Sequence, residues 1–298
     1  MSVHSCHRRV RPLVTRPATF VILALLAARA AAAQAPSPLR RAAFLPPAGA
    51  NVVTIVAHEY AYTMPDTIPA GLTTFILRDE GKEEHHMTLM KVDSGKTLAD
   101  VFSALRAGPE AAPPRWLLPV GGPNAPAPGG MSNATLELAP GNYVALCMIP
   151  APDKAPHFAH GMVKWLVVTP SKGKPAPLPA ADLTITLTDY DFTPSKPLAT
   201  GHQRIAITNT SAQPHELVIS RYDEGQGNAQ FVKWAYDPQG KPMPGHAMGG
   251  ATALLPGHTV IIDETFPPGR YGFVCFIPDA MDGKPHFMHG MQKEFVIN

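Results

Sequence analysis

The chain has 298 residues, of which 34 are proline and 24 are glycine, while only 16% are charged. Proline lacks a backbone N–H and breaks helix interiors, so this composition excludes a coiled coil or a long-helix protein. A hydrophobic content of 45% excludes a disordered chain. The formal net charge is only +2, and three cysteines are too few for a disulfide framework.

Residues 1–35 have the pattern of a secretory signal peptide. Arg8 and Arg9 belong to a basic segment, Phe20–Ala28 is an apolar run, and residues 30–35 are small residues typical of a cleavage site. The apolar run is too short to span a bilayer. We therefore expect a soluble exported protein, periplasmic or secreted, without stable membrane insertion; an uncleaved N-terminal anchor is the alternative.

Loss of residues 1–35 would change the charge of the chain. This segment carries five arginines and no acidic residue, so 20 basic residues would remain against 23 acidic ones. Such a balance provides no basic surface for nucleic acid, and we expect no nucleic-acid partner.

The remaining chain contains an internal repeat at an interval of roughly 130 residues. Residues 59–63 match residues 189–193, and Pro156–Met162 is nearly identical to Pro285–Met291. Five such matches occur in the same order, which indicates two copies of one module. We assign the copies and their linkers as follows: linker 36–50, first copy 51–170, linker 171–180 and second copy 181–298.

Short runs rich in Val, Ile, Thr and aromatic residues, bounded by Pro, Gly, Asn and Asp, predict β-strands throughout both copies. In the first copy the predicted strands are Val52–Val56, Thr73–Leu77, Met87–Val92, Thr135–Leu138, Tyr143–Met148 and Lys164–Val168. In the second copy they are Leu183–Thr188, Arg204–Asn209, Glu216–Ser220, Thr259–Thr265, Tyr271–Phe276 and Lys293–Ile297. Short helices are predicted at residues 97–106 and 230–236. Many short strands predict an all-β fold, a sandwich or a barrel.

Each copy contains a His, a Cys about sixty residues later, and then a His and a Met close behind. Two imidazoles and one thiolate, with a weak thioether on the axis, form the ligand set of an electron-transfer copper site. Thiolate and thioether favour Cu(I), and imidazole also suits Cu(II), so one site can hold both states. The candidate metal ligands are His85, Cys147, His157 and Met162 in the first copy, and His215, Cys275, His286 and Met291 in the second.

Taken singly, none of these residues indicates a metal site. A lone buried Cys is usually a small hydrophobic residue, and a lone Met usually fills a gap in a core. The repetition of the same order in both copies is what favours ligands. His160 and His289 lie two residues before the Met of each copy and are alternatives to His157 and His286.

Three motifs of the second copy resemble the cupredoxin family, the small blue copper proteins such as plastocyanin. Asn209–His215 is similar to the segment in which an Asn precedes the first histidine ligand, Tyr190–Pro194 fits the opening of the family, and Pro285–Met291 resembles its Pro-His-x-x-x-Gly-Met ending. The resemblance covers nearly all of residues 51–298. It implies two tandem Greek-key β-sandwich domains, each with a type 1 copper site at one end.

Two departures from the family pattern concern the surroundings of the sites. The interval from Cys to the second His is 11 positions in the second copy and 10 in the first, longer than in plastocyanin-like loops. The first copy has Asp79 where the second has Asn209, and Glu83 and Glu84 precede His85. These acids predict extra negative charge, and therefore a lower reduction potential, at the first site.

The pattern favours an exported electron carrier rather than an enzyme. Multicopper oxidases and copper nitrite reductases need additional histidines, and the sequence contains no His-x-His or His-Cys-His element. The alternatives are a protein that stores or delivers copper and a metal-free cupredoxin domain used for binding. The expected partner is accordingly a redox protein or a copper acceptor.

Overall fold

The computed structural model describes residues 44–298 apart from 107–113, 173–175 and 239. The described residues belong to one compact unit, Arg41–Asn298. The predicted signal peptide and residues 36–43 of the predicted first linker lie outside them. No helix among the described residues has the length and apolar character needed to cross a membrane.

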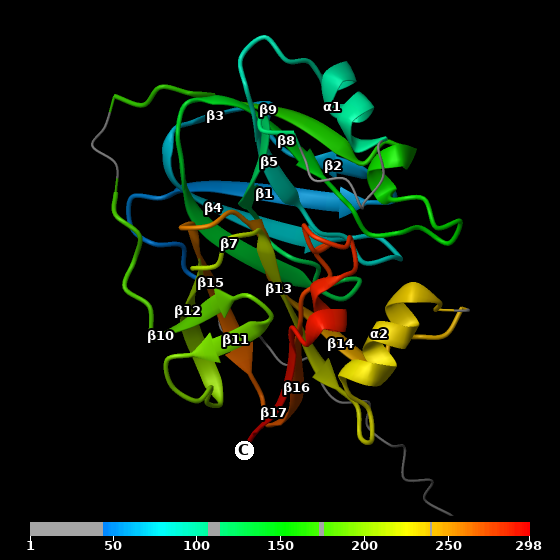
Figure 1. Ribbon diagram of the computed structural model, residues 1–298. Helices are drawn as coiled ribbons and strands as arrows, with labels where there is room; N and C mark the ends of the chain where they lie inside the picture. The colour runs from blue at the N-terminus through cyan, green and yellow to red at the C-terminus, as the bar shows by residue number, and fades with distance from the viewer. Residues whose placement is uncertain (1–43, 107–113, 173–175, 239) are drawn as a thin grey trace, which may run out of the picture. The chain divides into compact units, whose positions relative to one another are not determined.

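The chain is all-β, with two short α-helices and two 3-10 turns among the described residues (Figure 1). The strands of the first copy are β1 (Asn51–His58), β2 (Ala61–Thr63), β3 (Thr67–Pro69), β4 (Gly71–Asp79), β5 (Thr88–Val92), β6 (Leu117–Gly121), β7 (Met131–Leu138), β8 (Gly141–Leu146) and β9 (Val163–Thr169). Those of the second copy are β10 (Leu183–Thr188), β11 (Asp191–Pro194), β12 (Gly201–Asn209), β13 (His215–Tyr222), β14 (Gly245–Leu254), β15 (Thr259–Phe266), β16 (Gly269–Val274) and β17 (Gln292–Ile297). The helices are α1 (Leu98–Leu105) and α2 (Asn228–Tyr236), and the 3-10 turns are His157–His160 and His286–His289.

Alternation of buried and exposed side chains explains why the regular strands form. Along β10, residues Leu183, Ile185 and Leu187 are buried, and the threonines between them are partly exposed. Successive side chains of a strand point to opposite faces of the sheet, so this pattern places one apolar face on the core. The main core contains residues from strands of both copies and of both sheets.

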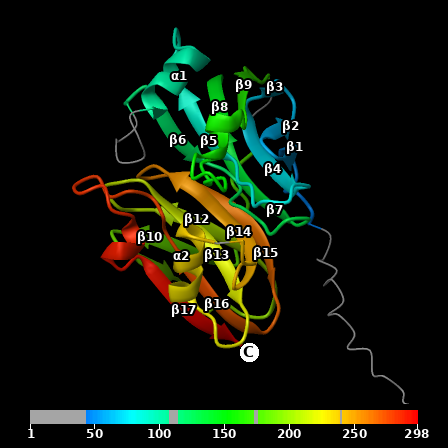
Figure 2. The ribbon, with the colours of Figure 1, turned by 90° about the vertical axis from the view of Figure 1, so that its right-hand side faces the viewer.

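The strands form two sheets, and each sheet runs through both copies (Figures 1 and 2). The eight-stranded sheet has the order β11-β10-β12-β15-β7-β4-β1-β2, and the nine-stranded sheet has the order β17-β16-β13-β14-β6-β5-β8-β9-β3. Each sheet is symmetric about its centre: apart from β3, every strand of one copy has its repeat equivalent from the other copy at the same distance on the opposite side. The copies are therefore joined by strand pairing between β7 and β15 and between β6 and β14, and not only by the 171–180 linker.

Hydrogen bonds where the copies meet are reciprocal, as expected for an approximate two-fold arrangement. The backbone N–H of Asn124 donates to the carbonyl of Gly250 at 3.2 Å, and the N–H of Thr252 donates to the carbonyl of Gly122 at 3.0 Å. The positions involved in one copy are the counterparts of those in the other. Equivalent segments of the two copies therefore pack against each other.

The predicted strands and both predicted helices are present, with bounds that differ by a few residues. The sequence did not predict β2, β3, β6, β11 and β14. Strand β14 was missed because its GHAMGGATAL sequence is rich in glycine and alanine, which are depleted in strands. Residues 247–254 of β14 are nevertheless all buried, since β14 lies between β13 and β6 in the nine-stranded sheet.

Gly250 provides a test of this close packing. It has φ +120°, and a Cβ there would collide with the backbone carbonyl oxygen of Leu217. We expect Gly250→Ala to lower the free energy of unfolding by about 1–3 kcal/mol more than Gly71→Ala, because overpacking adds to the backbone strain. Gly71 is the matched control, since it has φ +116° and nothing within 4 Å of the added Cβ. Equal losses in chemical denaturation would contradict the close approach.

Candidate metal centres

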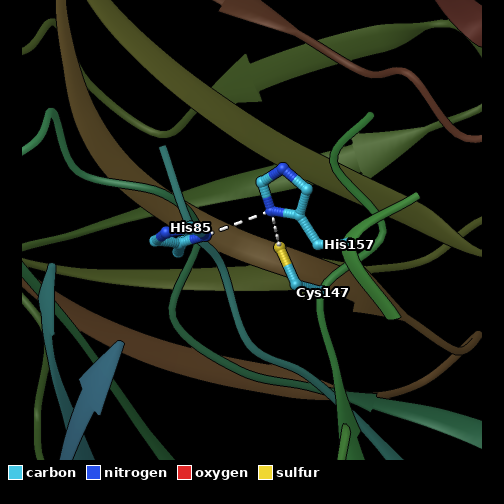
Figure 3. A group of neighbouring side chains, drawn as sticks. All are labelled: His85, Cys147 and His157. Carbon is cyan, nitrogen blue, oxygen red and sulfur yellow. Dashed lines mark hydrogen bonds between the residues drawn. The ribbon is translucent and has the colours of Figure 1, made fainter. Parts of the chain in front are cut away.

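The first candidate centre brings together His85, Cys147 and His157 (Figure 3). All three residues are fully buried. The Nδ1 atoms of the two histidines lie 3.1 Å apart, and the Cys147 Sγ lies 3.4 Å from Nδ1 of His157. Three potential metal ligands that span 72 positions of the sequence therefore lie close together.

The second candidate centre has the same construction. His215 and His286 have their Nδ1 atoms 2.9 Å apart, and the Cys275 Sγ lies 3.4 Å from Nδ1 of His286. These three residues are also fully buried. The near-identity of the two sets of distances shows that both copies of the repeat build one and the same arrangement.

The residues of both centres fit copper. Donor atoms that each contact one ion at about 2.0–2.3 Å must lie roughly 3–4 Å from one another. The His–His and Cys–second-His distances of both sites are 2.9–3.4 Å, and all the donor atoms of a site lie within 4.8 Å of one another. Two imidazoles with one thiolate form the donor set of electron-transfer copper sites. We refer below to the first site (His85, Cys147, His157) and the second site (His215, Cys275, His286).

Backbone hydrogen bonds fix the Cys, the second His and the following Met in the same way in both copies. In the second copy the N–H of Phe287 donates to Cys275 at 3.0 Å, the N–H of Met291 to His286 at 3.0 Å, and the N–H of Cys275 to Met291 at 3.2 Å. The corresponding bonds of the first copy measure 2.9, 3.1 and 3.3 Å. Gly290 has φ +103°, a conformation that favours glycine, which explains the glycine of the motif.

The predicted axial ligands Met162 and Met291 are fully buried and belong to these backbone networks. Burial and backbone position place both methionines next to the cysteine and histidine of their own copy. Their role as ligands stays a prediction.

The residues of the long Cys-to-His interval form a loop that is closed in the same way in both copies. In the second copy Pro278 bridges Pro285, and the N–H of Asp279 donates to the carbonyl of Lys284 at 2.8 Å. In the first copy Pro150 bridges Pro156 in the same manner. The additional residue of the second copy is therefore accommodated outside the cluster.

Burial keeps the groups of both sites uncharged in the metal-free chain. It lowers the pKa of His85, His157 and His286 to about 4, and it raises the pKa of the Cys147 thiol to about 12. The pKa of the Cys275 thiol is raised well above its usual range by the same cause. A metal ion that binds here must therefore displace the thiol proton.

His160 and His289 lie outside the two clusters. Each is partly exposed, and each pairs with an aspartate of the preceding loop: His160 Nε2 lies 3.1 Å from Asp153, and His289 Nε2 lies 3.1 Å from Asp282. Among the described residues, the structure thus brings His157 and His286, rather than these two, next to the cysteines.

A carboxylate lies near the outer nitrogen of each histidine in the first site. Glu83 Oε2 is 3.0 Å from Nε2 of His157, and Glu59 Oε1 is 3.9 Å from Nε2 of His85. The Tyr60 hydroxyl donates to the other oxygen of Glu83 at 3.3 Å, and its ring packs against His157 at 4.9 Å between centroids. Such carboxylates orient histidine ligands and raise their basicity.

In the second site a carboxylate also lies near the outer nitrogen of each histidine; Asp189 is the repeat equivalent of Glu59, whereas Asp279 is not the equivalent of Glu83. Asp189 Oδ1 lies 3.4 Å from Nε2 of His215, and Asp279 Oδ2 lies 3.7 Å from Nε2 of His286. Gln213, which stands where the first copy has Glu83, donates to Asp279 at 2.9 Å. A hydrogen bond from the Tyr190 hydroxyl is the main cause that holds the pKa of Asp279 below its usual range.

Negative charge beside the histidines is therefore not confined to the first site, and the lower reduction potential of that site stays a prediction. Both sites have carboxylates beside their histidines, because the Cys-to-His loop of the second copy supplies Asp279. Asp79 instead accepts backbone N–H bonds from Gly81 and His85, both at 3.0 Å, and burial raises its pKa to about 6. Burial also raises the pKa of Glu84 to about 8, so that this acid is largely neutral near pH 7.

The acids Glu59, Asp189 and Asp279 were not predicted from the sequence as neighbours of the sites. One signal could have found two of them: Glu59 and Asp189 each precede a tyrosine at equivalent positions of the repeat. Asp279 has no acidic equivalent in the first copy, so nothing in the repeat pointed to it.

Two buried His–Cys–His clusters, each with a methionine close behind, occur in an all-β chain whose motifs resemble those of cupredoxins. In these features the chain resembles cupredoxins. No family model and no curated protein matches it. Solved structures do match it, at low TM-scores.

Three of these structures illustrate the range of proteins that the chain matches. A reduced auracyanin from the photosynthetic bacterium Roseiflexus castenholzii is 27% identical and covers 41% of this chain and 100% of its own, with a TM-score of 0.30. Auracyanin A, a blue copper protein from Chloroflexus aurantiacus, is 17% identical and covers 39% and 99%, with a TM-score of 0.26. A multicopper oxidase is 13% identical and covers 83% and 88%, with a TM-score of 0.25.

The choice between the two histidines that follow each cysteine can be tested with matched variants. We expect His286→Gln to abolish copper binding at the second site, because it removes a buried donor atom. His289→Gln should leave binding within a few-fold of the unaltered chain, because it removes only a partly exposed imidazole. Isothermal titration of each full-length variant with copper checks this, and the reverse order of effects would make His289 the ligand.

Proposed function

We propose that the chain is an exported copper protein with two tandem Greek-key cupredoxin-like domains, residues 51–170 and 181–298. Each domain would hold one mononuclear type 1-like copper, through His85, Cys147, His157 and Met162 in the first and His215, Cys275, His286 and Met291 in the second. The observation that carries the proposal is the pair of buried His–Cys–His clusters with nearly the same internal distances. The bound copper would supply reversible exchange of one electron.

The residues around each site suit such a role. Full burial of the cysteine and both histidines excludes water, and the backbone bonds through Met162 and Met291 limit rearrangement of the donors. A site that moves little when its charge changes exchanges electrons with little reorganisation. The proposed partner is a redox protein, and export by a cleaved signal peptide in residues 1–35 would place the chain in the periplasm or outside the cell.

Catalysis is not part of this proposal. An oxidase or nitrite reductase needs a further copper centre built from additional histidines. Other histidines of the chain already have different contacts: His86 accepts the N–H of Met148 at 2.8 Å, and His202 pairs with Asp263 at 3.0 Å. These contacts support an electron carrier.

One surface feature favours a second candidate, storage or delivery of copper. Met281 and Met288 are 92% and 60% exposed, and both lie in the Cys-to-Met segment of the second copy. Thioethers are soft ligands that favour Cu(I), so exposed methionines near the second site could pass copper to an acceptor protein.

The decisive experiment measures the copper stoichiometry of the chain and the one-electron redox behaviour of each site. We expect the full-length chain to bind two copper ions, and Cys147→Ala and Cys275→Ala each to lose one of them together with its thiolate-to-copper visible band. Reversible one-electron voltammetry at both sites supports the carrier, whereas rapid transfer of copper to a metal-free acceptor supports delivery. Absence of bound copper would leave a metal-free binding domain.

The contact between Glu83 and His157 makes a prediction about the reduction potential of the first site. Negative charge favours Cu(II) over Cu(I), so Glu83→Gln should raise this potential, by roughly 1 kcal/mol or ~40 mV, and leave the second site unchanged. Glu80→Gln is the matched control, because it removes the same charge from an exposed residue three positions earlier. Equal shifts in the two variants would show that Glu83 acts only through the overall charge of the loop.

A further inference from the structure

The nine-stranded sheet ends in different ways in the two copies. At one edge, β9 of the first copy is covered by β3, which runs parallel to it. At the other edge, β17 is the equivalent of β9, and it is the outermost strand of the sheet (Figure 2). The backbone N–H and C=O groups of an uncovered edge are a template for pairing with another strand. The two copies therefore differ at a place where a strand can be added.

In the first copy, β3 shows what a covering strand contributes to this edge. The N–H of Val167 in β9 donates to the carbonyl of Asp66 at 2.9 Å, and the Asp66 carboxylate forms an ion pair with Lys164 of β9. Ile68, in the middle of β3, is buried. The covering strand thus supplies a backbone acceptor, an acidic side chain and an apolar side chain.

In the second copy, the equivalent residues 196–199 form no strand. Lys293 of β17 is the repeat equivalent of Lys164, but Lys196 stands where the first copy has Asp66. Two like charges, which repel each other, therefore replace the ion pair that joins β3 to β9.

Hydrogen bonds also hold this segment of the second copy against β10, which belongs to the eight-stranded sheet. The N–H of Ser195 donates to the carbonyl of Thr184 at 2.8 Å, and the Ser195 Oγ accepts the N–H of Thr184 at 3.0 Å. The first copy has Pro65 in place of Ser195, and proline has no N–H to donate. Charge and hydrogen bonding thus both keep the segment from pairing with β17.

The outer edge of β17 is consequently exposed. Val296 pairs with Arg270 as Val167 pairs with Asn142, so the N–H of Val296 points out of the sheet edge as that of Val167 does. We find no acceptor for it among the described residues, and Val296 is 59% exposed. Beside this edge lies a mainly apolar groove of about 220 Å³, whose lining includes Pro194, Pro197, Leu198, Phe295 and Val296.

We propose that the outer edge of β17 binds an extended segment of a partner protein, which adds a parallel strand as β3 does in the first copy. An aliphatic side chain in the middle of that segment enters the groove, and an acidic side chain two positions before it faces Lys196 and Lys293. Lys196 is exposed and forms no ion pair with the residues that the structure describes, so an acid matches the charge of this edge. Because β17 begins directly after Met291, the partner docks on the strand that leaves the second site, and bound metal is not required.

The first test uses a synthetic peptide with the sequence of residues 64–72, which contains β3. Titrated into the full-length chain and followed by NMR, it should shift the backbone amide of Val296 and leave that of Val167 unchanged. Ile68→Asp in the peptide should weaken binding at least roughly tenfold, because an aliphatic side chain is no longer removed from water. Absence of binding, or a shift of Val167 instead, would overturn the proposal.

The second test reverses the charges. Asp66→Lys in the peptide should weaken binding roughly 2–5-fold, the range of an exposed ion pair. Lys196→Glu in the chain should reverse this preference, so that the lysine peptide binds more tightly than the original one. Lys172→Glu is the matched control, because it changes the same charge at an exposed position outside the groove. Equal effects of the two chain variants would contradict a role for Lys196.

The third test removes the backbone donor of the edge. Proline is tolerated in an edge strand where its nitrogen faces outward, so Val296→Pro should leave the urea midpoint nearly unchanged and abolish peptide binding. Val167→Pro is the matched control and should lower the midpoint, because the Val167 N–H bonds to Asp66. Similar losses of stability in the two variants, or peptide binding that survives Val296→Pro, would show that β17 offers no open edge.

The competing occupant is a second copy of this chain. Sedimentation of the chain alone distinguishes it, and we expect a monomer at micromolar concentration. A dimer that Val296→Pro dissociates would make the second copy the occupant and overturn the assignment to a partner protein.

Discussion

The structure depends on holding one thiol and two imidazoles together out of contact with water, twice in the same chain. Buried polar groups are costly unless they find partners. In each cluster the two Nδ1 atoms, and the sulfur and the second Nδ1 atom, face one another at 2.9–3.4 Å. A soft cation satisfies such an arrangement, and the surrounding hydrogen bonds and apolar core serve to maintain it.

The repeat of the sequence explains both the similarity of the sites and the way in which they are joined. Equivalent strands stand at equivalent distances from the centre of each sheet, and the bonds between the copies are reciprocal. At this boundary the Asn124 Nδ2 donates to Glu216 Oε2 at 3.5 Å, which joins the first copy to the residue that follows the first histidine of the second copy.

The surroundings of the sites have diverged while the clusters have not. The first copy covers the outer nitrogen of His157 with Glu83, from the loop before His85. The second copy has Gln213 at that position and places Asp279 near His286 instead. A carboxylate beside the second histidine can therefore come from different sequence positions in the two copies. Aligning the copies does not identify Asp279 as the acid that takes the place of Glu83.

The sequence by itself determined the all-β class, the repeat and the eight candidate ligands, because strand patterns and ligand order are local properties. The tertiary structure alone decided which acid faces which histidine and how the copies meet. Glu83 and His157 are 74 positions apart, and Asn124 and Glu216 are 92 positions apart, so no local pattern connects them. Strand β14 could also be identified only from the tertiary structure, because its burial between two neighbouring strands outweighs the weak β-propensity of its glycines.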